Sequence, residues 1–93
     1  MKKRKKNPVT EKLIDEACFR MRLSLAQMII IGLHRKKWSV NRLAKRAGYS
    51  PKFVERVIQC KASMRVGAVA NLVGALGYTA HIVTEKIDTK ALN

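Results

Sequence analysis

The side chains of this sequence that could act together chemically are its lysines and arginines, which gather in two places. Residues 1–7 hold five basic side chains and no acidic one, and residues 35–65 hold ten against Glu55 alone. The remaining stretches are balanced, so these two account for the whole formal net charge of +14. A charge needed only for solubility would be spread along the chain. Its confinement to one tail and one segment predicts a polyanionic partner.

Other kinds of chemistry are not indicated by the sequence. Cys18 and Cys60 lie 42 positions apart, and together with His34 and His81 they form no pair at zinc-ligand spacing. We therefore expect no metal and no other cofactor. We also find no nucleophile–base pair, carboxylate dyad or phosphate-cradling loop, so an enzyme is not expected. The longest apolar run, residues 28–33, is too short to cross a bilayer. A cytoplasmic, nucleoid-associated protein without a membrane partner is the expectation.

The length and composition predict one small domain with an aliphatic core. Residues 8–77 should form a helical domain of four to five helices, and residues 1–7 a flexible basic arm. Residues 78–93 are expected to form a strand-like tail, because Tyr78-Thr-Ala-His-Ile-Val-Thr is rich in strand-forming types. A lone strand is unstable, so a short C-terminal β-strand would need a partner and could serve in dimerisation.

Three serines can each cap the start of a helix. Ser24, Ser39 and Ser50 each follow an apolar residue and precede another by four positions, which is the spacing of a hydrophobic staple. The three apolar pairs are Leu23 with Met28, Trp38 with Leu43, and Tyr49 with Val54. Trp38 is accordingly expected in the core rather than as a base-stacking surface. One long helix over residues 11–36, running through Ser24, is the alternative to a helix start there.

Residues 39–60 are predicted to form two short helices joined by a tight turn. Gly48 supplies the positive φ that ends the first helix, and Ala44 is small enough for the second helix to approach. Ser50 begins the second helix, whose inward residues include Val54 and Val57. The pattern alone is also typical of an ordinary helical hairpin. The staples and the local positive charge favour a DNA-reading pair of helices.

A further helix is expected from about Met64 to Leu76, ended by Gly77. Helical spacing predicts that its core face consists of Val66, Val69, Ala70, Val73 and Leu76. A domain this small rarely buries two full apolar stripes, so a second stripe and the tail are predicted to meet another subunit. The predicted dimer interface is Met64, Ala68, Leu72, Ala75, Tyr78 and Ile82.

Residues 24–77 resemble the Cro/repressor-type helix-turn-helix family, which includes the lambda-repressor-like domains. The resemblance rests on Leu43-Ala44, Gly48, Ser50, Val54, Val57 and the helix end Leu76-Gly77-Tyr78. It implies an all-α fold, a prokaryotic or phage source, and a dimer that inserts the second motif helix, residues 51–60, into the major groove. The sequence departs from the family pattern at Val40, where the family often has Gln, and at Ile58 and Cys60, where it often has Glu and Gly.

The resemblance also implies which side chains contact DNA. The predicted base-reading residues are Pro51, Lys52, Glu55, Arg56 and Gln59. Among them, lysine and arginine can donate to the O6 and N7 atoms of guanine. The predicted phosphate contacts are Lys2, Lys3, Arg4, Lys5, Lys6, Arg35, Lys36, Lys37, Ser39, Arg42, Lys45, Arg46, Ser50 and Lys61.

Together these features predict a sequence-specific transcriptional regulator that binds double-stranded DNA. Repression by a homodimer on a two-fold operator is favoured, because blocking a promoter needs no further parts. One alternative is an antitoxin whose C-terminal strand binds a toxin protein. Another is a non-specific nucleic-acid-binding protein driven by the basic arm, residues 1–7.

Overall fold

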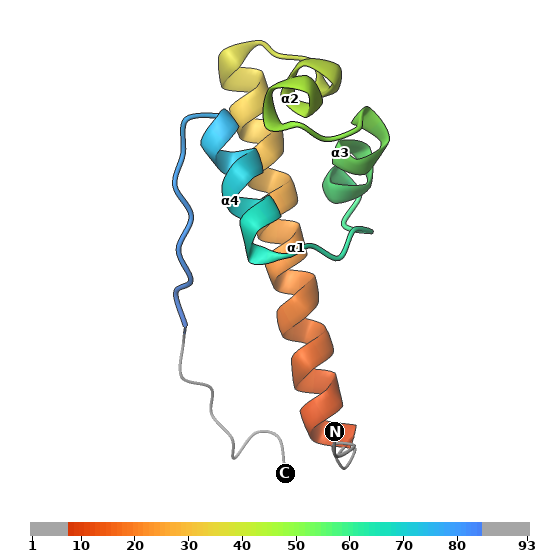
Figure 1. The fold of residues 1–93 in the computed structure, drawn as a ribbon. Coiled ribbons are helices and arrows are strands. Elements are labelled where there is room, and N and C mark those ends of the chain that lie inside the picture. Colours follow the sequence, from red (N-terminus) through yellow and green to blue (C-terminus); the bar gives the residue numbers. More distant parts are fainter. Residues whose placement is uncertain (1–7, 85–93) are drawn as a thin grey trace.

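The computed structural model of the protein describes residues 8–84, which contain four α-helices and no strand (Figure 1). The helices are α1 (Pro8–Lys36), α2 (Val40–Ala47), α3 (Pro51–Ile58) and α4 (Val66–Ala75). The predicted all-α class is confirmed for this part of the chain. Residues 78–84, predicted to be strand-like, form a loop without regular structure. None of the described helices is long and apolar enough to span a membrane.

The first helix is one continuous helix, so the predicted helix start at Ser24 is wrong and the long-helix alternative is right. No glycine or proline interrupts residues 9–31, so nothing in the sequence near Ser24 breaks the helix. The other two caps are confirmed. The Ser39 hydroxyl accepts a bond from the backbone N–H of Arg42 at 3.1 Å, and the Ser50 hydroxyl one from that of Phe53 at 3.2 Å.

All four helices end in the same way. A residue with a positive φ lies just beyond the end of each helix: Lys37 (57°), Gly48 (83°), Cys60 (61°) and Gly77 (88°). The next backbone N–H then donates to a carbonyl five residues back, at 2.8 Å from Tyr49 to Ala44 and at 2.9 to 3.0 Å in the other three helices. This is the Schellman arrangement, which satisfies carbonyls at a helix end. The predicted roles of Gly48 and Gly77 are confirmed, whereas Lys37 and Cys60 take this conformation without being glycine.

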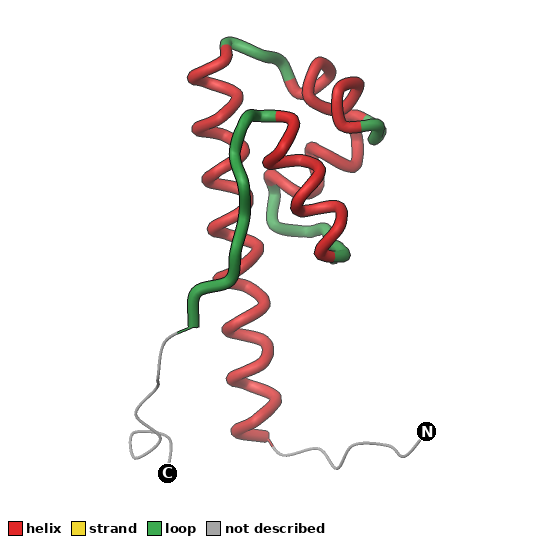
Figure 2. Tube along the Cα trace, turned by 60° about the vertical axis from the view of Figure 1, so that its left-hand side comes forward, coloured by secondary structure: helices red, strands yellow, loops and turns green. Residues whose placement is uncertain are grey.

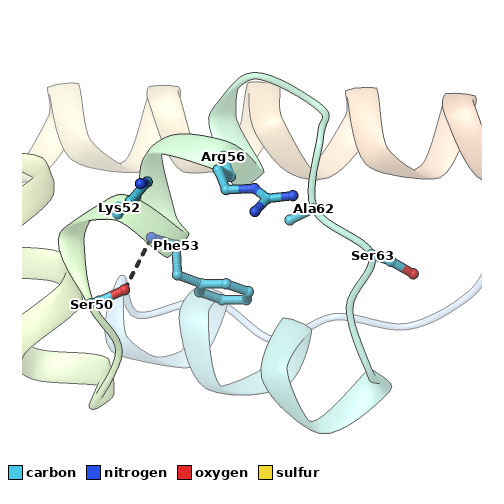
Figure 3. A pocket seen from close by; sticks show the side chains of 6 residues that line it. All are labelled: Ser50, Lys52, Phe53, Arg56, Ala62 and Ser63. Atoms are coloured by element: carbon cyan, nitrogen blue, oxygen red, sulfur yellow. Dashed lines mark hydrogen bonds between the residues drawn. The ribbon is translucent and has the colours of Figure 1, made fainter.

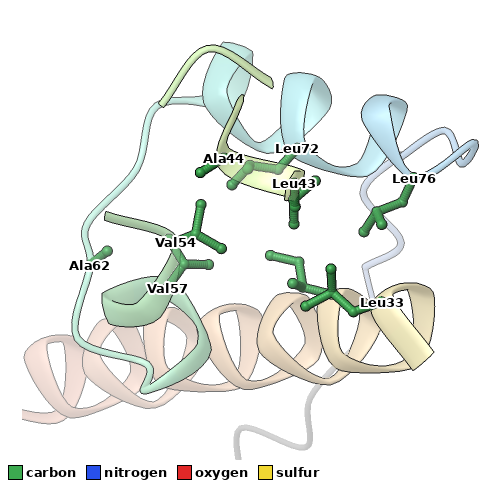
Figure 4. Packing of buried hydrophobic residues seen from close by; sticks show 9 residues of the cluster. Leu33, Leu43, Ala44, Val54, Val57, Ala62, Leu72 and Leu76 are labelled. Atoms are coloured by element: carbon green, nitrogen blue, oxygen red, sulfur yellow. The ribbon is translucent and has the colours of Figure 1, made fainter. Parts of the chain in front are cut away.

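The core lies where α2, α3 and α4 surround the C-terminal half of α1 (Figures 1 and 4). Its cluster of buried side chains is Ile29, Leu33, Leu43, Ala44, Val54, Val57, Ala62, Leu72 and Leu76. The inward positions predicted for Ala44, Val54 and Val57 are therefore confirmed. Trp38 is partly buried and packs against this cluster, as the sequence predicted, and Ile58 does the same.

The predicted inward face of α4 is only partly right. Val73 and Leu76 are buried as expected, but Val66 is 78% exposed, and Leu72, assigned to the dimer interface, is fully buried at 0%. The reason is that α4 packs against both α1 and α2, so two of its stripes face the interior.

The remaining residues of the predicted interface also differ in how far they are buried. Met64, Ala75 and Tyr78 are half-buried and pack against the core, and Ala68 is half-buried, while Ile82 in the following loop is 70% exposed. Most of the predicted interface residues on α4 therefore pack within one chain. Leu72 is buried, so its assignment to a dimer interface is wrong.

Candidate nucleic-acid interface

The outer face of α3 presents all the residues predicted to read bases. Pro51 occupies the first turn behind the Ser50 cap, and the buried Val54 and Val57 fix which side of α3 faces the core. The opposite side carries the five exposed residues Pro51, Lys52, Glu55, Arg56 and Gln59, with Gln59 at the C-terminal cap. The structure thus brings them together on one short, well-anchored helix. Their role in base reading stays a prediction.

An open pocket lies beside this face, a feature that the sequence did not indicate. It has a volume of about 350 Å³ and is lined by Ser50, Lys52, Phe53, Arg56, Ala62 and Ser63 (Figure 3). The Phe53 ring lies between α3 and the segment that returns toward α4. It also packs against Tyr49, with 5.0 Å between the ring centroids. Residues Ala62 and Ser63 had no signal in the sequence, because their place depends on the path of an irregular segment.

Three cationic side chains gather around one aromatic ring at the junction of α1 and α2. The Lys36 Nζ lies 5.0 Å from the centroid of the Trp38 ring, the Arg42 Cζ 5.1 Å and the Arg46 Cζ 5.5 Å. These distances are within the range of cation–π attraction. The sequence has no acidic residue between Glu16 and Glu55. The ring therefore helps to concentrate positive charges that repel one another, and a bound anion would relieve that repulsion.

The other predicted phosphate-contacting residues of the described part lie at the surface. Arg35, Lys36, Lys37, Ser39, Arg42, Lys45, Arg46, Ser50 and Lys61 are all exposed. Ser39 and Ser50 already use their hydroxyl oxygens as helix caps, and the Arg35 guanidinium donates to the hydroxyl of Tyr78 at 3.0 Å. Lys2, Lys3, Arg4, Lys5 and Lys6 lie outside the described residues.

The elements that carry the predicted DNA contacts of the described residues lie together in the fold. α2, α3 and the C-terminal end of α1 lie at the same end of the molecule, so the basic residues from 35 to 61 share that end (Figure 1). Among residues 8–84, no group of three or more His, Cys, Asp and Glu side chains could hold a metal ion. Cys18 is exposed, Cys60 is half-buried, and both are free.

Comparison of the chain with protein-family models, with curated proteins and with solved structures gives no match.

Proposed function

We propose that the protein is a sequence-specific DNA-binding regulator in which α2 and α3 form a helix-turn-helix of the Cro/repressor type. It acts in the cytoplasm on nucleoid DNA, as a homodimer on a two-fold operator, and it represses by occluding a promoter. The observation that carries the proposal is the outer face of α3, where exposed Lys52 and Arg56 stand one helical turn apart on a helix anchored by buried Val54 and Val57.

The dimensions and chemistry of α3 support its placement in the major groove of DNA. The groove admits an α-helix, and it exposes the O6 and N7 acceptors of guanine to side chains that can donate to both. Arg56 has the planar fork for such a bidentate contact, while Lys52 offers a single ammonium. Like charges four residues apart on a helix repel each other slightly, so an anion or acceptor between them is favourable.

The basic residues flanking α3 support the contacts to the DNA backbone. Lys36, Arg42 and Arg46 are held together by the Trp38 ring, at the same end of the molecule as α3. Phosphate contacts fix the register and orientation of a protein on DNA, while base contacts choose the sequence. The Trp38 cluster is accordingly assigned to phosphates and the outer face of α3 to bases.

The test begins with selection of bound sequences from a random DNA pool, followed by affinity measurements on the selected site and on random DNA. Arg56→Ala should weaken binding to the selected site by about 1–3 kcal/mol and relax the preference at one base position. Lys52→Ala should have a similar but smaller effect, because lysine lacks the bidentate fork.

Lys45→Ala is the matched control, since Lys45 is an exposed cation on α2 rather than on α3. It should weaken binding to all sequences alike and reduce the slope of log affinity against log salt by about 0.9. An Arg56→Ala variant that loses affinity equally on selected and random DNA would reassign Arg56 to phosphate. Failure of the pool to converge on any sequence would favour non-specific nucleic-acid binding instead.

A further inference from the structure

The open pocket beside α3 combines apolar and cationic side chains (Figures 2 and 3). Phe53 is half-buried and Ala62 is buried, whereas Lys52, Arg56 and Ser63 are exposed. The apolar members of the lining are therefore recessed relative to the cationic ones. None of the six lining residues is acidic. A recess of this kind suits a group that is apolar at its tip and carries a hydrogen-bond acceptor beside that tip.

The pocket lies where α3 is proposed to meet the bases of DNA, so the inference drawn from it rests on the proposed function. Lys52 and Arg56, which are assigned to base contacts, line one side. The opposite side belongs to the segment that follows α3, and this segment carries exposed Lys61 and Arg65 on either side of the pocket residues. Cations on that segment suit contacts to the DNA backbone. The pocket therefore lies between base contacts and backbone contacts, where a base edge would face it.

One base presents an apolar group in the major groove of unmodified DNA. Thymine carries its C5-methyl group there, beside the acceptor O4, whereas guanine, adenine and cytosine are distinguished by their donors and acceptors. A donor or acceptor placed over the Phe53 ring would lose its water without gaining a partner, which is unfavourable. A methyl group loses no hydrogen bond there, and its burial is favourable. The lining thus matches thymine better than it matches any other base.

We propose that this pocket reads a thymine, with the C5-methyl group against the Phe53 ring and O4 accepting a hydrogen bond from Lys52. The Lys52 ammonium has several N–H donors, so it can serve this oxygen together with an acceptor of a neighbouring base. Arg56 remains the contact to guanine, because its planar fork matches the O6 and N7 pair. The bound sequence therefore contains a T·A pair next to that guanine, and Phe53 determines specificity alongside the two cations.

The first test uses the unmodified chain and the site selected from the random DNA pool. Each thymine is replaced in turn by deoxyuridine, which removes the C5-methyl group and leaves O4 in place. Replacement at one position per half-site, next to the guanine, should weaken binding about fourfold, the effect of one buried methyl group. Replacement at other positions should leave the affinity unchanged.

The two ways in which this test can fail are distinct. A selected site without a sensitive thymine would overturn the reading of thymine and leave the proposed function standing. A pool that converges on no sequence would overturn both.

The second test asks whether Phe53 is the side chain that meets the methyl group. Phe53→Ala should bind the thymine and deoxyuridine sites equally. Phe19→Ala is the matched control, because it removes the other phenylalanine of the sequence, which is 55% exposed on α1; it should keep the difference of about fourfold. The same difference persisting in Phe53→Ala would overturn the assignment to Phe53. Circular dichroism verifies that each variant is folded.

A third measurement needs no variant, so it holds even where Phe53→Ala fails to fold. 5-Iodouracil takes the place of the sensitive thymine, and ultraviolet light crosslinks it to a side chain in contact with its C5 position. Mass spectrometry of the crosslinked chain should locate the adduct at Phe53. An adduct at any other residue would overturn the proposed contact.

Discussion

The two halves of α1 differ in burial although both are rich in apolar side chains. In the C-terminal half, Ile29 is fully buried and Leu33 is 9% exposed, whereas in the N-terminal half Ile14 and Met21 are 42% and 59% exposed. The difference comes from what packs against each half, since α3 and α4 contact α1 only where the core lies. Apolar spacing thus identifies a helix, while its partners decide which of its apolar residues form a core.

Truncating one side chain of the core and one of the exposed N-terminal half of α1 should give the largest contrast. Leu72→Ala leaves a cavity at a fully buried position, so we expect the free energy of unfolding to fall by about 2–5 kcal/mol. Ile14→Ala, measured at a concentration where the chain is monomeric, should cost under about 1 kcal/mol, since little buried area is lost. Denaturant unfolding followed by circular dichroism measures both. Equal losses would mean that Ile14 is covered within a single chain, contrary to the comparison.

A smaller change in stability should distinguish Gly32 from Gly74, two glycines that the sequence alone does not tell apart. A Cβ added at Gly32 would lie 2.8 Å from the Leu76 Cδ1 and 3.3 Å from the Leu76 Cβ, while at Gly74 nothing lies within 4 Å. Leu76 is only 2% exposed and cannot turn aside freely. Gly32→Ala should therefore destabilise the protein by about 1–3 kcal/mol.

Gly74→Ala is the control for that substitution. It should instead stabilise the protein by about 0.4–1 kcal/mol, because alanine reduces the freedom of the unfolded chain without a clash. The two midpoints of thermal unfolding should move in opposite directions. A stabilising Gly32→Ala would show that α1 and α4 can separate at this contact without cost.

Local signals in the sequence predicted the part of the fold from Ser39 to Val57 well. The serine caps and the positive φ of Gly48 depend on residues within one or two turns, and each is present as expected. Predictions that needed tertiary context did less well. Ser24 has the spacing of a cap but lies within α1, and Leu72 has the spacing of an outer stripe but is buried, because α4 packs on two neighbours.

For the candidate site too, local signals predicted some features, and features that depend on tertiary contacts were missed. The exposure of Lys52, Arg56 and their neighbours on α3 could be predicted, because Val54 and Val57 indicate which side of that helix faces inward. The pocket beside Phe53 and the cations gathered at Trp38 were not predicted. Both depend on segments that come together only in the folded protein, so no spacing along the chain indicates them.

The last expected effect concerns the end of α3, within the packed region. Cys60 has φ 61°, a conformation that costs most residues about 1–2 kcal/mol and glycine much less. Cys60→Gly should therefore raise the free energy of unfolding by about 1 kcal/mol, after allowing for the greater freedom of glycine in the unfolded chain. Cys60→Ala is the matched control, because it removes the thiol but keeps the Cβ. Thermal unfolding of the two variants measures the contribution of the backbone as the difference between their stabilities. An equal gain in Cys60→Ala would assign the effect to the thiol and leave the conformation of Cys60 without a measurable cost.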